Sequence, residues 1–148
     1  MGDDAPPITW CPQYGSQVAA LSATKIFEVL MEGNRGPGKT DWLLMDFAQH
    51  VGKGYGREWR GVLFRQTFPQ LADVVNKSQK LFKGVFPAAR YNQADHVWTF
   101  PDGEQLFLRH MMRQADYWNF HGHAYPWIGW EELCNWPDDK CYRVMMSC

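Results

Sequence analysis

Residues 33–40 have the composition and spacing of a phosphate-binding loop. They match the pattern G-x-x-x-x-G-K-[ST], in which glycines let successive backbone N–H groups surround an anion. A helix beginning near Lys39 would direct its partial positive charge to the same place, with Lys39 on the β- and γ-phosphates and the Thr40 hydroxyl on Mg²⁺. A coincidental glycine turn is the alternative interpretation. The predicted nucleotide-binding residues are Gly33, Asn34, Arg35, Gly36, Pro37, Gly38, Lys39 and Thr40.

An acidic pair further along the chain could complete such a site. Glu131 and Glu132 directly follow the apolar run 125–130, which has the length of a buried strand. In this arrangement the first carboxylate holds Mg²⁺ through water, and the second orients or deprotonates the attacking water. An acidic loop or a helix start at Glu131 would look the same in the sequence. Because a phosphate loop and strand-end acids meet at one edge of a parallel sheet, the pairing favours the catalytic interpretation.

The elements that must position these groups follow from apolar patterning and turn residues. Strands alternating with helices predict an α/β sheet, and Pro101 to Glu104 have the chemistry of a β-hairpin turn. The predicted helices cover residues 17–23, residues 39–51, and a segment opened by Thr67 and Pro69 that ends before Pro87. The predicted strands cover 26–31, 61–65, 97–100, 105–109 and 125–130, and a further strand is expected to begin at 142–146.

Composition fits one folded unit and argues against several classes of protein. The 148 residues are close to the ~150 of an average domain, and 45% of them are hydrophobic. With 15 Lys and Arg against 16 Asp and Glu, a polybasic nucleic-acid tail is excluded, so any nucleic-acid contact must come from a local patch. No apolar run reaches the ~18 to 20 residues that a membrane span needs, and we expect no membrane association. The acidic start of the chain is unlike a signal peptide.

Taken in order along the chain, several segments resemble the ATPase domain of the large terminase subunit of tailed bacteriophages. The resemblance covers residues 12 to about 136. The phosphate loop is common to many ATPases, whereas the ordered series of the other segments is more specific. These segments are 12–17, 28–30 running into the loop, 64–71, 89–92, 98–103, 120–122 and 128–133.

The resemblance implies a fold, a function and a set of partners. The expected fold is a P-loop NTPase of the ASCE/RecA-like type, with a mainly parallel sheet flanked by helices and a β-hairpin insertion. Such proteins hydrolyse ATP with Mg²⁺ to drive double-stranded DNA into a procapsid, in the cytoplasm of the host bacterium. The implied partners are that DNA, the procapsid portal, the small terminase subunit and further copies of the motor in a ring.

Roles for individual residues also follow from the resemblance. Gln17 matches the adenine-contacting glutamine and Glu132 the catalytic carboxylate. Arg35 matches an arginine that senses or stabilises the γ-phosphate, although a solvated loop residue is an equal alternative. Glu131 stands where most members have Asp; its longer side chain can reach Mg²⁺, but the added methylene puts the efficiency of hydrolysis in question.

The domain division and the alternatives complete the expectations. Residues 1–16 are expected to be an irregular lead-in, and residues 17–148 a partial ATPase domain that is incomplete at its C-terminus and lacks the nuclease domain of the family. Another P-loop ATPase acting on nucleic acid, such as a helicase or recombinase-like protein, is one alternative, and a non-catalytic remnant is another. The basic residues Lys77, Lys80 and Lys83 on one predicted helix fit either DNA contact or a solvated surface.

Overall fold

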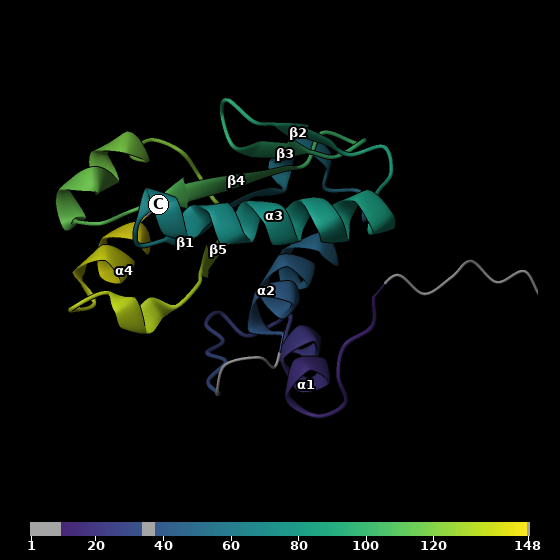
Figure 1. Ribbon diagram of the computed structural model, residues 1–148, viewed down its shortest axis with the longest axis horizontal. Coiled ribbons are helices and arrows are strands. Elements are labelled where there is room, and N and C mark those ends of the chain that lie inside the picture. Colours follow the sequence, from purple (N-terminus) through teal and green to yellow (C-terminus); the bar gives the residue numbers. More distant parts are fainter. Residues whose placement is uncertain (1–9, 34–37, 148) are drawn as a thin grey trace, which may run out of the picture.

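The computed structural model describes residues 10–33 and 38–147, which form an α/β structure (Figure 1). Its mixed sheet has the strand order β2-β3-β4-β1-β5. The strands are β1 (Arg60–Arg65), β2 (Arg90–Asn92), β3 (Val97–Thr99), β4 (Gln105–His110) and β5 (Trp127–Trp130). The α-helices are α1 (Ser16–Ser22), α2 (Lys39–Ala48), α3 (Phe68–Val85) and α4 (Lys140–Met145). Short 3₁₀-helices are η1 (Gly56–Glu58), η2 (Gln114–Asn119) and η3 (Leu133–Asn135).

Strand β1 organises the sheet because it pairs in parallel with β4 on one side and with β5 on the other. Its successive side chains point to opposite faces, as in any strand. Leu63 belongs to the larger core beneath α2 and α3, whereas Val62 and Phe64 belong to a second core with Trp136 and Met145. Figure 1 shows α3 running along the sheet, with α2 and α1 below it. The two cores place helices on both faces of the sheet.

Helix α3 forms where the sequence predicts it. Thr67 precedes the helix with an extended backbone, and Pro69 lies in the first turn, where the missing N–H costs no helical hydrogen bond. Leu71 and Val74 are buried against the core at helical spacing. Ser78 is also fully buried, and its hydroxyl accepts a 2.9 Å hydrogen bond from Trp98 Nε1, which ties the helix to β3.

The predicted hairpin is present, but it does not form an insertion. The Phe100 N–H donates to the Glu104 carbonyl at 2.9 Å, and Gly103 has a φ of 98°, a value that glycine adopts without strain. The second strand of this hairpin is β4, which lies in the interior of the sheet beside β1. The sheet is therefore mixed rather than mainly parallel, since β3 pairs antiparallel with both β2 and β4.

The strand predicted at residues 26–31 is not formed. This segment has no helical or ladder assignment, and Phe27 and Leu30 expose 86% and 70% of their surface. Apolar composition alone does not make a strand, because a strand also needs a neighbour that pairs with its backbone, and the described sheet ends at β5. The Tyr142 hydroxyl donates to Glu28 at 2.8 Å and joins this segment to α4.

The strand expected to begin at residues 142–146 is also wrong. These residues belong largely to α4, whose buried side chains Cys141 and Met145 are four residues apart and share one helix face. In a segment this short, a run of apolar residues does not separate a strand from a helix. Among the described residues, no helix is both long and apolar enough to cross a membrane.

Candidate functional site

The carboxyl ends of β1 and β5 lie side by side and carry two charged residues. Arg65 is the last residue of β1, and Glu131 directly follows β5. The Glu131 N–H donates to the Phe64 carbonyl at 3.0 Å, which continues the parallel ladder to the acid itself. On the other side of β1, the Met111 N–H donates to the Arg65 carbonyl at 3.0 Å. Backbone hydrogen bonds therefore fix the main chain of Arg65 and Glu131 at one edge of the sheet.

Helix α2 begins at this same edge. Gly38 precedes it with a left-handed backbone, φ 69° and ψ 30°, which favours glycine. A Cβ at this position would also lie 2.9 Å from Gln17 Nε2, so the end of that side chain would have to shift. Gln17 is buried, donates to the Gly38 carbonyl at 3.2 Å and accepts a hydrogen bond from the Gln13 N–H at 2.7 Å. The predicted adenine contact thus lies against the end of the predicted phosphate loop.

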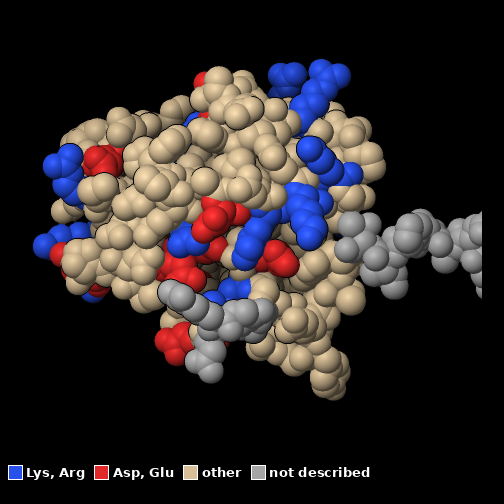
Figure 2. All heavy atoms as spheres, viewed as in Figure 1, with Lys and Arg blue, Asp and Glu red and all other residues tan. Residues whose placement is uncertain are grey.

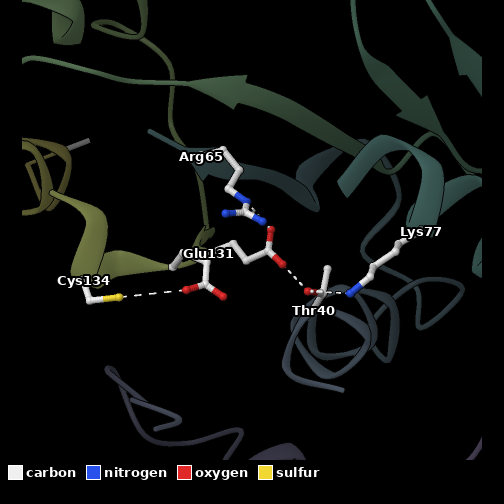
Figure 3. A network of polar contacts seen from close by, with 6 residues as sticks. Thr40, Arg65, Lys77, Glu131 and Cys134 are labelled. Carbon is white, nitrogen blue, oxygen red and sulfur yellow. Dashed lines mark hydrogen bonds and ion pairs between the residues drawn. The ribbon is translucent and has the colours of Figure 1, made fainter. Parts of the chain in front are cut away.

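A buried polar network joins the start of α2 to the end of β5 (Figure 3). The Thr40 hydroxyl donates to Glu131 Oε1 although the two residues are 91 positions apart. Arg65 Nε donates to the other carboxylate oxygen at 2.7 Å, and the side chains of Arg65 and Glu131 are only 12% and 7% exposed. Both oxygens of Glu131 therefore have partners, which limits the orientations open to its carboxylate.

Two lysines lie near this network. Lys77 of α3 points toward Thr40 and donates from Nζ to Oγ1 at 3.2 Å (Figure 3). Lys39 Nζ donates to the Gly33 carbonyl at 2.6 Å, so its side chain folds back toward the loop. On the face drawn in Figure 2, acidic and basic side chains gather together in front of α3 and the start of α2. The site thus joins a carboxylate to several cationic groups.

Glu132 lies outside the Thr40–Glu131 network. Its backbone is left-handed, with φ 54° and ψ 49°, and its exposed side chain accepts a long contact from Cys134 Sγ at 3.9 Å. Glu132 directly precedes η3, and its carboxylate contacts Cys134, whereas the Glu131 carboxylate contacts Thr40 and Arg65. The structure brings together Gln17, Gly38, Thr40 and Glu131, but it does not bring Glu132 to them.

The donor atoms at the edge fit a magnesium ion. Thr40 supplies a hydroxyl oxygen and Glu131 a carboxylate oxygen, which are the hard ligands that Mg²⁺ prefers. Magnesium in nucleotide sites is held by one or two protein oxygens, with phosphates and water completing the shell. No group of three or more His, Cys, Asp or Glu that could hold a metal occurs in the described part of the chain. A metal here would accordingly require the nucleotide phosphates as further ligands.

Asp46 links the helix and the strand that carry the site. Trp127 Nε1 of β5 donates to Asp46 Oδ2 of α2 at 2.8 Å, which holds the helix against the strand. Burial raises the pKa of the Asp46 carboxyl, and the hydrogen bond from Trp127 partly offsets this effect by stabilising the charged form. The same helix and strand carry Thr40 and Glu131, so this contact helps to set their separation.

Part of the prediction lies beyond what the structure describes. Asn34, Arg35, Gly36 and Pro37 fall outside the described residues. Conversely, the predicted site omits Arg65 and Lys77. The sequence does indicate a place for Arg65 in the site, because this residue ends a predicted strand. Parallel strands place their carboxyl ends at one edge of a sheet. Lys77 carries no such signal, since only the packing of α3 against α2 shows where its ammonium group lies.

Comparisons with known proteins give no family assignment. No protein-family model, curated protein or solved structure matches this chain.

Proposed function

We propose that this chain binds ATP with Mg²⁺ at the edge formed by α2, β1 and β5, as a P-loop NTPase. The observation that carries the proposal is the contact between Thr40 and Glu131. The sequence assigns them separately, one as the hydroxyl of a phosphate loop and the other as a strand-end acid. Their convergence over 91 positions is the arrangement that a metal-dependent phosphate site needs.

The other residues of the proposed site have separate roles in binding and hydrolysis. Lys39 and the loop backbone bind the phosphates, and Gln17, which hydrogen-bonds to the Gly38 carbonyl, contacts the base. Thr40 and Glu131 would hold magnesium, which would neutralise charge on the phosphates. Glu132 orients the attacking water, which requires its exposed carboxylate to turn from Cys134 toward the phosphates. Arg35 supplies positive charge to the γ-phosphate.

We further propose that the chain is the ATPase part of a viral DNA-packaging motor. The support is the resemblance of segments spread over residues 12 to 136 to large terminase subunits. On this proposal, ATP hydrolysis drives double-stranded DNA into a procapsid. The portal, the small terminase subunit and a ring of further copies are its partners in the infected host.

A titration with a fluorescent ATP analogue and Mg²⁺ tests the nucleotide site. Wild type should bind and Lys39→Ala should bind at least about tenfold more weakly, because the loop lysine contacts the phosphates directly. Lys80→Ala serves as the matched control, since this exposed lysine lies on α3 and belongs to no ion pair among the described residues. Equal affinity in wild type and Lys39→Ala would refute the proposal.

A second candidate, nucleotide binding without hydrolysis, is favoured by two observations. The segment before the loop is not paired into the sheet, and the Glu132 carboxylate contacts Cys134 rather than Thr40 or Glu131 among the hydrogen bonds of the described residues. Phosphate release measured with wild type and Glu132→Gln separates the candidates. Hydrolysis by wild type that is lost in Glu132→Gln, with binding retained, supports the ATPase. Binding without phosphate release in either protein supports the second candidate.

A further inference from the structure

Lys77 is an exposed residue of α3, yet its side chain makes a polar contact with another helix. Its ammonium group donates to Thr40 Oγ1 at 3.2 Å, across the contact between α3 and α2. Asp73 lies one turn earlier on α3, yet none of the ion pairs formed within the described residues includes Lys77. The charge of Lys77 is therefore directed to a hydroxyl group rather than neutralised by a neighbouring carboxylate.

The hydroxyl that Lys77 contacts is itself bonded to a buried carboxylate. Thr40 donates its hydroxyl hydrogen to Glu131, which leaves the lone pairs of Oγ1 as acceptors. Lys77 uses one of these lone pairs. The ammonium group thus contacts Thr40 Oγ1, one of the two protein oxygens that fit a magnesium ion, while within the described residues the Glu131 carboxylate forms its ion pair with Arg65.

An ammonium group and a divalent cation on one hydroxyl oxygen repel each other at short range. Lys77 therefore has to leave Thr40 when Oγ1 becomes a metal ligand. The flexible four-carbon stem of lysine allows such a movement, and phosphate oxygens of a nucleotide at the same edge are strong acceptors for the released ammonium. When no metal is present, Lys77 can contact phosphate without this competition.

We propose that Lys77 is a cationic residue of the nucleotide site. When magnesium is absent, its ammonium group occupies the position of the metal beside Thr40 and Glu131 and binds nucleotide phosphate. This inference rests on the proposed nucleotide site and adds a phosphate-binding residue from α3 to it. Lys77 thereby sets how strongly nucleotide binding depends on magnesium. The neighbouring Lys80 makes no polar contact with α2 in the described chain, so it does not share this role.

The test compares Lys77→Met with the matched control Lys80→Met in the full chain. Affinity for a fluorescent ATP analogue is measured once with excess Mg²⁺ and once with EDTA. Lys77→Met should bind about tenfold more weakly in EDTA, the effect of one charge-assisted hydrogen bond, and less than about threefold more weakly with Mg²⁺. Lys80→Met should match wild type in both, and Lys77→Arg should restore binding in EDTA.

The outcomes separate this inference from the nucleotide site itself. An equal loss under both conditions, or no loss in EDTA, overturns the role of Lys77 while leaving the site intact. If wild type binds no analogue, or if Lys39→Ala binds as well as wild type, the nucleotide site and this inference both fail. Circular dichroism of Lys77→Met should match wild type, because the residue is exposed and contributes nothing to the core.

Discussion

Removal of the Arg65 charge should cost far more stability than removal of an equally close surface partner. Arg65 and Glu131 are 2.7 Å apart with side chains only 12% and 7% exposed. Arg65→Met leaves the Glu131 carboxylate buried with one hydroxyl partner, and breaking a buried pair in this way costs about 3 kcal/mol. For a chain of this size, the melting temperature should fall by roughly 6 to 12 °C.

The matched comparison is the Arg143–Asp139 pair, which is as short at 2.6 Å but has side chains 77% and 59% exposed. Arg143→Met should cost less than about 1 kcal/mol, because solvent screens an exposed pair. Urea denaturation of each variant gives the free energy of unfolding. The double variant Arg65→Met/Glu131→Leu should recover most of the loss, since no charge is then left buried alone. Equal costs for Arg65→Met and Arg143→Met, or additive costs in the double variant, would refute the reasoning.

Further outcomes follow from the packing around the site. Gly38→Ala should lower the free energy of unfolding by about 1 to 2 kcal/mol in urea denaturation, because φ is 69°, and it should weaken binding of the ATP analogue because the end of the Gln17 side chain would have to move. Gly61→Ala should cost about 1 to 3 kcal/mol by the same assay, since its Cβ would lie 2.6 Å from the Phe47 ring; wild-type stability would contradict the observed packing. Burial raises the pKa of Asp46 above 3.8, so the folded state binds its proton more tightly than the unfolded state. The stability that Asp46 contributes should be complete below that value and lost as pH rises through the raised pKa, and Asp46→Asn should remove this dependence in denaturation curves across pH; parallel curves for the two proteins would contradict it.

The local elements of this protein could be predicted because their signals lie within short segments. Pro69 and the apolar spacing that includes Leu71 mark α3, and glycine and proline mark the hairpin turn between β3 and β4. The sequence likewise predicts that Thr40 and Glu131 lie at one sheet edge, and the structure places them in contact. The helix and the hairpin are predictable because turn chemistry and helical periodicity are properties of neighbouring residues, whereas the Thr40–Glu131 contact follows from the rule that such groups gather at one edge of a sheet.

The predictions that fail are those that depend on a distant partner. Residues 26–31 have the composition of a strand, but pairing requires a neighbouring backbone that a composition cannot specify. The same limit applies to β4, which lies in the interior of the sheet, parallel to β1 and antiparallel to β3. The role of Glu132 beside Glu131 stays a prediction, since its exposed carboxylate is in contact with Cys134.

The sequence by itself determined the α/β class, and it carries the patterns on which the proposed site rests: a glycine loop before a helix and an acid at the end of a strand. Only the tertiary structure decided which charges meet at that site. Arg65 reaches Glu131 because β1 and β5 are parallel neighbours, and Lys77 reaches Thr40 because α3 packs against α2. The physical reason is that residue type and spacing fix the chemistry and the local conformation, whereas contacts between side chains far apart in the sequence exist only after the chain has packed.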